Sequence, residues 1–307
     1  EPETWGTGYV DYPTMIQPIF DRHCVSCHGG EQDIAGEIDL SGGWTELFNI
    51  SYENLISRRQ VQYTATLIAG IDCMNGTANW SAQIFPPYSH GSGSAPLAAV
   101  VVEGHEGRID GLSRTERDLL LAWIDTNGVY FGTWDYSNNG CKTAGWQETK
   151  SQLITAMEQS GCAECHGQNG RITKFESDWF NLRRPEWSRI LRAPLAKNNV
   201  EENDDPAGLA WCRNRPVDPR HERIRIMTMG GYVHQVTALN DFPRLEPFER
   251  DSSGDPVVSF ASTEDPAYQQ MLSIIERGRG LALSAPRVDM PGAVIQPGSF
   301  RQSLPKR

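Results

Sequence analysis

Two copies of one short cysteine motif constrain this chain more than any other feature of its sequence. The pattern Cys-x-x-Cys-His consists of Cys24, Cys27 and His28 in the first copy and Cys162, Cys165 and His166 in the second. Two thiols at this spacing can form thioethers with the vinyl groups of one haem, and the adjoining histidine becomes the proximal ligand of the iron. A lone Cys-x-x-Cys also occurs in zinc sites and redox dithiols, but two complete motifs predict two covalently bound haem c groups.

A short amphipathic helix is expected ahead of each motif. The first apolar stripe with helical spacing consists of Met15, Ile16, Ile19 and Phe20. The second consists of Leu153, Ile154 and Met157, and Gly161 stands where that helix should end. In c-type cytochromes such a helix packs its apolar face on the haem.

The clearest predicted helix of the first half covers residues 114–127. Ser113 and Glu116 form a capping box at its start, and Gly128 follows as a C-terminal stop. Its buried face is expected to contain Leu120, Trp123 and Ile124.

The second half is expected to be looser. A helical turn or two is predicted over residues 187–195, and a late helix over residues 266–277, with Asp265 as its cap and Gly278 as its stop. Its buried face is expected to contain Tyr268, Leu272 and Ile275. Beyond Gly280 the chain is expected to be extended.

These elements predict a mainly α protein made of two cytochrome c-like haem domains with long irregular loops. The 29 glycines and 19 prolines favour such loops. The stretch 134–145, which contains Asn138, Asn139 and Gly140, has the composition of a linker. The sequence therefore predicts a first haem domain over residues 1–143 and a second over residues 144–307.

The charge of the chain limits its partners. The formal net charge is −11, which argues against a nucleic-acid ligand because binding phosphates needs a basic surface. An acidic electron carrier is expected to meet a redox protein with a basic docking face. No apolar run approaches the length of a transmembrane helix.

The distal iron ligands are less strongly marked. For the first haem, His105 is favoured because it precedes the capped helix, and His90 is the rival. For the second haem, Met290 is favoured because a loop methionine followed by proline is a common way to offer a thioether to iron. Its rivals are Met227, Met229, His221 and His234.

Three cysteines lie outside the motifs: Cys73, Cys141 and Cys212. They predict one disulfide and one spare thiol, because haem attachment occurs outside the cytoplasm, where disulfides persist. The pair Cys73–Cys141 is favoured because both residues lie in the first domain, whereas the alternative Cys141–Cys212 would join the two domains. A periplasmic or extracellular location is expected, with any signal peptide already removed.

The chain resembles the haem-bearing C-terminal portion of proteins related to the hydrazine synthase alpha subunit of planctomycetes. The resemblance rests on residues 11–13, 17–18, 21–28, 104–105, 122–127, 131–133, 179–182, 192–197, 208–212, 265–268 and 289–292. It implies two c-type haems, with His105 and Met290 as distal ligands. The catalytic haem of that family belongs to an upstream part, and no tyrosine here matches its ligand, so the resemblance implies electron relay and not hydrazine synthesis.

The expected function is electron transfer between redox partners through two haems, with no catalytic residues assigned. A di-haem cytochrome c peroxidase, a haem-dependent oxidoreductase, is the enzymatic alternative, because it also has two such motifs in a chain of about this length. A third possible function is that of a haem module within a larger multi-subunit or filamentous assembly.

Overall fold

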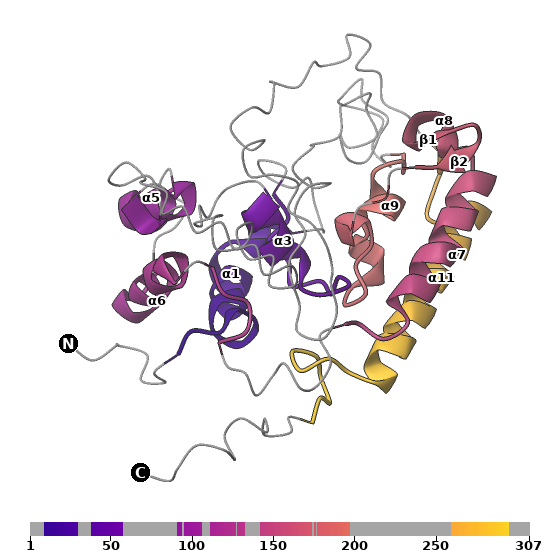
Figure 1. Cartoon of the computed structure of the whole chain (residues 1–307). Coiled ribbons are helices and arrows are strands. Elements are labelled where there is room, and N and C mark those ends of the chain that lie inside the picture. Colours follow the sequence, from indigo (N-terminus) through magenta and orange to yellow (C-terminus); the bar gives the residue numbers. More distant parts are fainter. Residues whose placement is uncertain are drawn as a thin grey trace, which may run out of the picture.

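The structure is a computed structural model. It describes residues 9–29, 38–57, 91–93, 95–105, 111–126, 128–132, 142–173, 175, 177–196 and 259–294. This part is mainly α-helical, as predicted, with one two-stranded hairpin (Figure 1). Several predicted residues lie outside it: His90, His221, His234, Met227, Met229, Cys73, Cys141 and Cys212.

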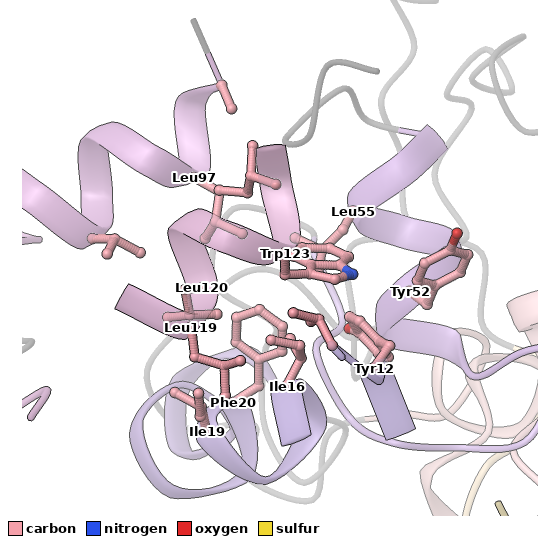
Figure 2. Packing of buried hydrophobic residues seen from close by; sticks show 14 of the residues in the cluster. Tyr12, Ile16, Ile19, Phe20, Tyr52, Leu55, Leu97, Leu119, Leu120 and Trp123 are labelled. Atoms are coloured by element: carbon pink, nitrogen blue, oxygen red, sulfur yellow. The ribbon is translucent and has the colours of Figure 1, made fainter. Parts of the chain in front are cut away.

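The first half contributes short helices that surround one hydrophobic cluster. They are η1 (Tyr12–Ile16), α1 (Gln17–His23), α2 (Val25–His28), α3 (Ile50–Ser57), η3 (Gly91–Gly93), α5 (Pro96–Glu103) and α6 (Arg114–Asp125). Figure 2 shows Ile16 and Phe20 packed beside Trp123, all of them at most 1% exposed. The apolar stripe ahead of the first motif therefore faces the core, together with Ile19.

The second half is built on two long helices that lie side by side (Figure 1). Its elements are α7 (Trp146–Gln159), α8 (Ala163–His166), β1 (Gly167–Gln168), β2 (Arg171–Ile172), η5 (Ser177–Trp179), η6 (Pro185–Trp187), α9 (Arg189–Arg192) and α11 (Pro266–Ser284). The start of α7 packs against the end of α11, where Gly145 approaches Leu281, and its end approaches the start of α11. Leu153 and Met157 of the second stripe are buried there, whereas Ile154 is only partly buried.

The predicted helix starts are confirmed. Ser113 and Glu116 make both hydrogen bonds of the capping box of α6. The Asp265 carboxylate accepts a hydrogen bond from the backbone N–H of Ala267 at 2.9 Å. The turns expected over residues 187–195 are present as the end of η6 and α9.

The predicted end of the late helix is wrong. Helix α11 runs through Gly278 and Gly280 and ends at Ser284, so residues 281–284, expected to be extended, are helical. Gly278 allows close packing instead, because a Cβ atom there would lie 2.4 Å from Thr149 Oγ1 of α7. A glycine inside a helix can thus mark a close helix contact and not a stop.

The buried apolar residues form two clusters. One is drawn from residues 10–131, and the other from residues 146–290 together with Trp44. This division lies close to the predicted boundary at residue 143, although the boundary itself stays a prediction. In the described ranges, no helix has both the length and the apolarity that crossing a membrane requires.

Candidate haem sites

The first motif lies where two short helices meet. Helix α1 ends at His23, Cys24 caps it, and α2 carries the motif to His28. The backbone N–H of His28 donates to the Cys24 carbonyl at 2.8 Å, which closes the turn that the Cys-x-x-Cys-His spacing predicts. Cys24 packs against the first cluster, and Cys27 is exposed. Burial raises the pKa of the Cys24 thiol to about 11, with a smaller contribution from Cys27.

The ring of His28 is held by the backbone. Its Nδ1 lies 3.2 Å from the carbonyl oxygen of Ile38. A carbonyl can only accept, so Nδ1 must carry the proton and Nε2 carries the lone pair that can bind a metal. Hydrogen bonding of the second ring nitrogen to a carbonyl is the usual way in which a protein orients a ligating histidine.

The structure brings His105 to His28. Their ring centres lie 6.2 Å apart, and their planes are inclined by 37°. A metal–imidazole bond is about 2 Å long, and the coordinating nitrogen lies about 1 Å from its ring centre. Two imidazoles on opposite sides of one metal ion should therefore have ring centres about 6 Å apart. The separation would allow both histidines to hold one metal ion, and it also lies within the range of ordinary ring contacts.

Helix α5 positions His105. The helix starts at Pro96, which suits the first turn because it lacks an N–H, and it ends at Glu103, with Gly104 as its C-terminal cap. Gly104 has a positive φ of 88°, and its N–H donates to the Val100 carbonyl at 3.1 Å. That conformation is costly for other residues, so the glycine turns the chain sharply just before His105.

The second motif follows α7 directly. The N–H of Cys162 donates to the Met157 carbonyl at 3.0 Å, after Gly161 with a φ of 80°. Gly161 therefore ends the helix as predicted. The N–H of His166 donates to the Cys162 carbonyl at 2.9 Å, as in the first motif.

Aromatic packing fixes the surroundings of His166. Its ring makes an edge-to-face contact with Trp179, with ring centres 4.8 Å apart and planes inclined by 71°. Phe175 follows Trp179 at 5.3 Å, so an aromatic wall lies beside the second motif. Thr173 donates its N–H to the His166 carbonyl at 3.1 Å, which ties the β1–β2 hairpin to the motif.

The structure does not bring Met290 beside His166. Met290 is buried in the second cluster, and its N–H donates to the Arg287 carbonyl at 2.8 Å. Arg287 contacts Thr143, which precedes the start of α7, whereas His166 follows its end. The intervening helix is about 21 Å long at 1.5 Å per residue. Figure 1 shows α8 and the chain after α11 at opposite ends of α7.

Sequence reasoning missed the part of the backbone that orients His28. The Ile38 carbonyl has no side-chain signature, so no motif could reveal it. His23, which precedes the first motif directly, lies with its Nε2 3.3 Å from Oε1 of Glu116.

No three His, Cys, Asp or Glu side chains gather as a metal-ion site within the described residues. No protein-family model, curated protein or solved structure matches the chain.

Proposed function

We propose that this chain is a di-haem c-type cytochrome that relays electrons between redox partners. The observation that carries the proposal is the pairing of His28 with His105 at 6.2 Å beside a complete attachment motif. A haem supplies one-electron redox chemistry when it is bound. An iron with two protein ligands has no open position for a substrate, so it suits electron transfer better than substrate activation.

Each motif residue has a defined role in this proposal. Cys24 and Cys27 would hold the first haem by thioethers, and His28 and His105 would be the ligands of its iron. Two histidine ligands lower the potential relative to a histidine–methionine pair. Cys162, Cys165 and His166 hold the second haem. Different ligand sets on the two irons would give the two haems different potentials and hence a direction for electron flow.

A peroxidase-like oxidoreductase remains the second candidate, and one observation favours it. Met290, the ligand expected for the second haem, lies near the start of α7, whereas His166 follows the end of that helix. In the described part of the chain, Met290 is therefore too far from His166 to share a metal ion with it. A haem with an open sixth position can bind and reduce a substrate such as peroxide.

Spectroscopy of the ligand variants tests the first haem. Purified holoprotein should contain two haems per chain, and the first should be low-spin. His105→Ala should turn about half of the haem high-spin, whereas His105→Met should restore a low-spin haem of higher potential. His23→Gln is the matched control, because His23 adjoins the motif but pairs with Glu116. An unchanged spectrum in His105→Ala would refute the ligand assignment.

The same preparations separate the two candidates. Rapid peroxide turnover by a stable high-spin haem in the unmodified protein would favour the peroxidase. A fully low-spin spectrum without turnover would favour the electron carrier. Assembly into a larger particle, expected for the third alternative, would appear as a native mass well above that of one chain.

The proposal extends to partners and location. The net charge of −11 supports a redox partner with a basic docking face, whose association rate should fall as ionic strength rises. Haem attachment supports a location outside the cytoplasm. The resemblance to hydrazine synthase alpha subunit-like proteins is consistent with a relay role.

A further inference from the structure

A short segment, residues 38–40, contacts His28 at two points. The ring Nδ1 of His28 lies 3.2 Å from the Ile38 carbonyl oxygen, and the backbone N–H of Leu40 donates to the His28 carbonyl at 2.7 Å. Asp39 lies between these two contacts and is 1% exposed. His28 is therefore fastened on both sides to a segment that contains a buried carboxyl group.

The Asp39 carboxyl group must lie near His28. The contact from His28 Nδ1 to the Ile38 oxygen is 3.2 Å long. Adding the lengths of the covalent bonds from that oxygen to the Asp39 carboxyl carbon gives a separation of at most about 10 Å between this carbon and Nδ1. A buried charge acts over such a distance, because little water lies between the groups to screen it.

Asp39 also faces charged groups of the second half. The positive charge of Arg189 on α9 lowers the pKa of Asp39, and the negative charge of Asp178 in η5 raises it. Arg189 and Asp178 form an ion pair at 2.5 Å, and Asp178 is 1% exposed. Glu53 of α3 is a further carboxyl group that interacts with Asp178. The charges around Asp39 thus connect the first haem motif with the second half.

Asp39 can change its charge in mildly acidic solution. Burial raises its pKa to about 6, although hydrogen bonds from Ser41 and the charge of Arg189 oppose this. One of these hydrogen bonds comes from the backbone N–H of Ser41 at 2.8 Å. The carboxyl group is therefore mainly ionised at pH 7 and mainly protonated at pH 5.

We propose that Asp39 is a positioning residue for the first haem: it is part of the segment that orients His28, and its negative charge, opposed by Arg189, lowers the potential of the iron. This inference rests on the proposed function. Ferric iron has one more positive charge than ferrous iron, so a buried carboxylate favours the ferric form. When one electron arrives from the redox partner, the Asp39 carboxylate binds a proton from solvent more readily, and the charge is balanced.

Redox titration of the holoprotein tests the proposal. Asp39→Asn removes the charge and keeps an oxygen that can accept the hydrogen bond from Ser41. At pH 7 we expect this variant to raise the equilibrium constant for reducing the first haem about tenfold, since a unit charge about 10 Å away has an effect of that order at an effective dielectric constant of about 20. A tenfold change is about 59 mV for one electron. The first haem is identified as the one whose spectrum His105→Ala alters.

The pH profile separates the charge of Asp39 from a purely structural role. In the unmodified protein the potential of the first haem should fall as pH rises from 5 to 7, because Asp39 ionises. In Asp39→Asn it should stay nearly constant, whereas Glu53→Gln should retain the fall. Asp118→Asn on α6 is the matched control, because it removes the same charge from a side chain that is 36% exposed. Solvent screens that charge, so the equilibrium constant should change less than about twofold.

Several results would overturn the proposal. One is an unchanged potential at pH 7 in Asp39→Asn, and another is an equal shift in Asp39→Asn and Asp118→Asn. If Asp39→Asn does not fold, a potential of the unmodified protein that is constant from pH 5 to 7, or a pH dependence that Glu53→Gln abolishes, would have the same meaning. A preparation without covalent haem would refute the proposed function itself, whereas a low-spin first haem that does not respond to Asp39→Asn refutes this inference alone.

Discussion

Arg287 and Asp289 form a two-pronged ion pair that is almost completely buried. Nε of Arg287 lies 2.5 Å from Oδ1 of Asp289, and Nη2 lies 2.8 Å from Oδ2. The same guanidinium donates to the carbonyl of Phe48 at 2.6 Å, and Tyr130 donates its hydroxyl to Asp289 at 2.8 Å. The chain that follows α11 is thus joined to the first half by charge-assisted hydrogen bonds.

We expect Arg287→Met to destabilise the protein by about 3–5 kcal/mol, because it leaves the Asp289 carboxylate buried without its cation. The double variant Arg287→Met/Asp289→Asn should recover a large part of that loss, since no buried charge remains. Chemical denaturation measures the free energy of unfolding of the single and the double variant. Arg171→Met is the control: Arg171 is 81% exposed and pairs with Glu158 at 3.6 Å, so its loss should cost less than about 1 kcal/mol. A similar small cost for Arg287→Met would contradict the structure.

The two glycines of α11 should respond in opposite directions to alanine. Gly278→Ala would place a Cβ 2.4 Å from Thr149 Oγ1, and the resulting displacement of α7 should cost about 1–3 kcal/mol. Gly280 has nothing within 4 Å of its Cβ position. Gly280→Ala should therefore stabilise the helix by about 0.5–1 kcal/mol. Unfolding midpoints of the two variants check this, and a stabilised Gly278→Ala would show that the helices pack less closely.

The features that could be predicted from the sequence are local ones. The capping box of α6 and the Asp265 cap depend on residues three or fewer positions apart, so their patterns are readable. The helix end predicted at Gly278 was wrong because a glycine can either end a helix or allow a second helix to pack closely. At Gly278 the neighbouring helix α7 packs closely. Local spacing cannot reveal such a partner.

The candidate site also combines features that local sequence patterns reveal with features that depend on distant contacts. Each Cys-x-x-Cys-His motif is a short local pattern. The structure places the ring centre of His105 6.2 Å from that of His28, whereas its role as an iron ligand stays a prediction. The placement of Met290 depends on the path of the chain after α11, which Arg287 fixes through contacts with Thr45 and Phe48 more than 200 positions away. A Met-Pro pattern contains no information about that path.

Glu116 links α1 to α6 and should make the protein sensitive to acid. Although burial raises its pKa, hydrogen bonds from Arg22, Ser113 and His23 outweigh this and lower it to about 2. A lowered pKa stabilises the folded state above the unfolded value of 4.5, and the stabilisation is lost as pH falls from there toward 2.

Glu116→Gln should therefore be less stable than the unmodified protein at pH 7, by less than about 1 kcal/mol because the pair with Arg22 is partly exposed. The difference should disappear near pH 2. Urea unfolding of both proteins at several pH values measures it. A difference that is constant from pH 7 to pH 2 would mean that the carboxylate charge contributes nothing.

Glu53 lies where the two clusters meet. Its carboxylate accepts hydrogen bonds from the hydroxyls of Thr45 and, across the contact, Ser177. Burial nevertheless dominates and raises the pKa of Glu53 to about 7. Asp39, which is also buried, behaves in the same way, with a pKa raised to about 6.

Between pH 4.5 and about 7 the folded protein should therefore hold a proton on Glu53 that the unfolded chain has released. The free energy of unfolding must then fall as pH rises through this window, by on the order of 2 kcal/mol in total. Glu53→Gln cannot ionise, so its stability should vary less over the same window, and the remaining slope should end near pH 6 because Asp39 still titrates. Urea unfolding of both proteins at pH 5, 6 and 8 tests this, and parallel curves would show that Glu53 is ionised in the folded state.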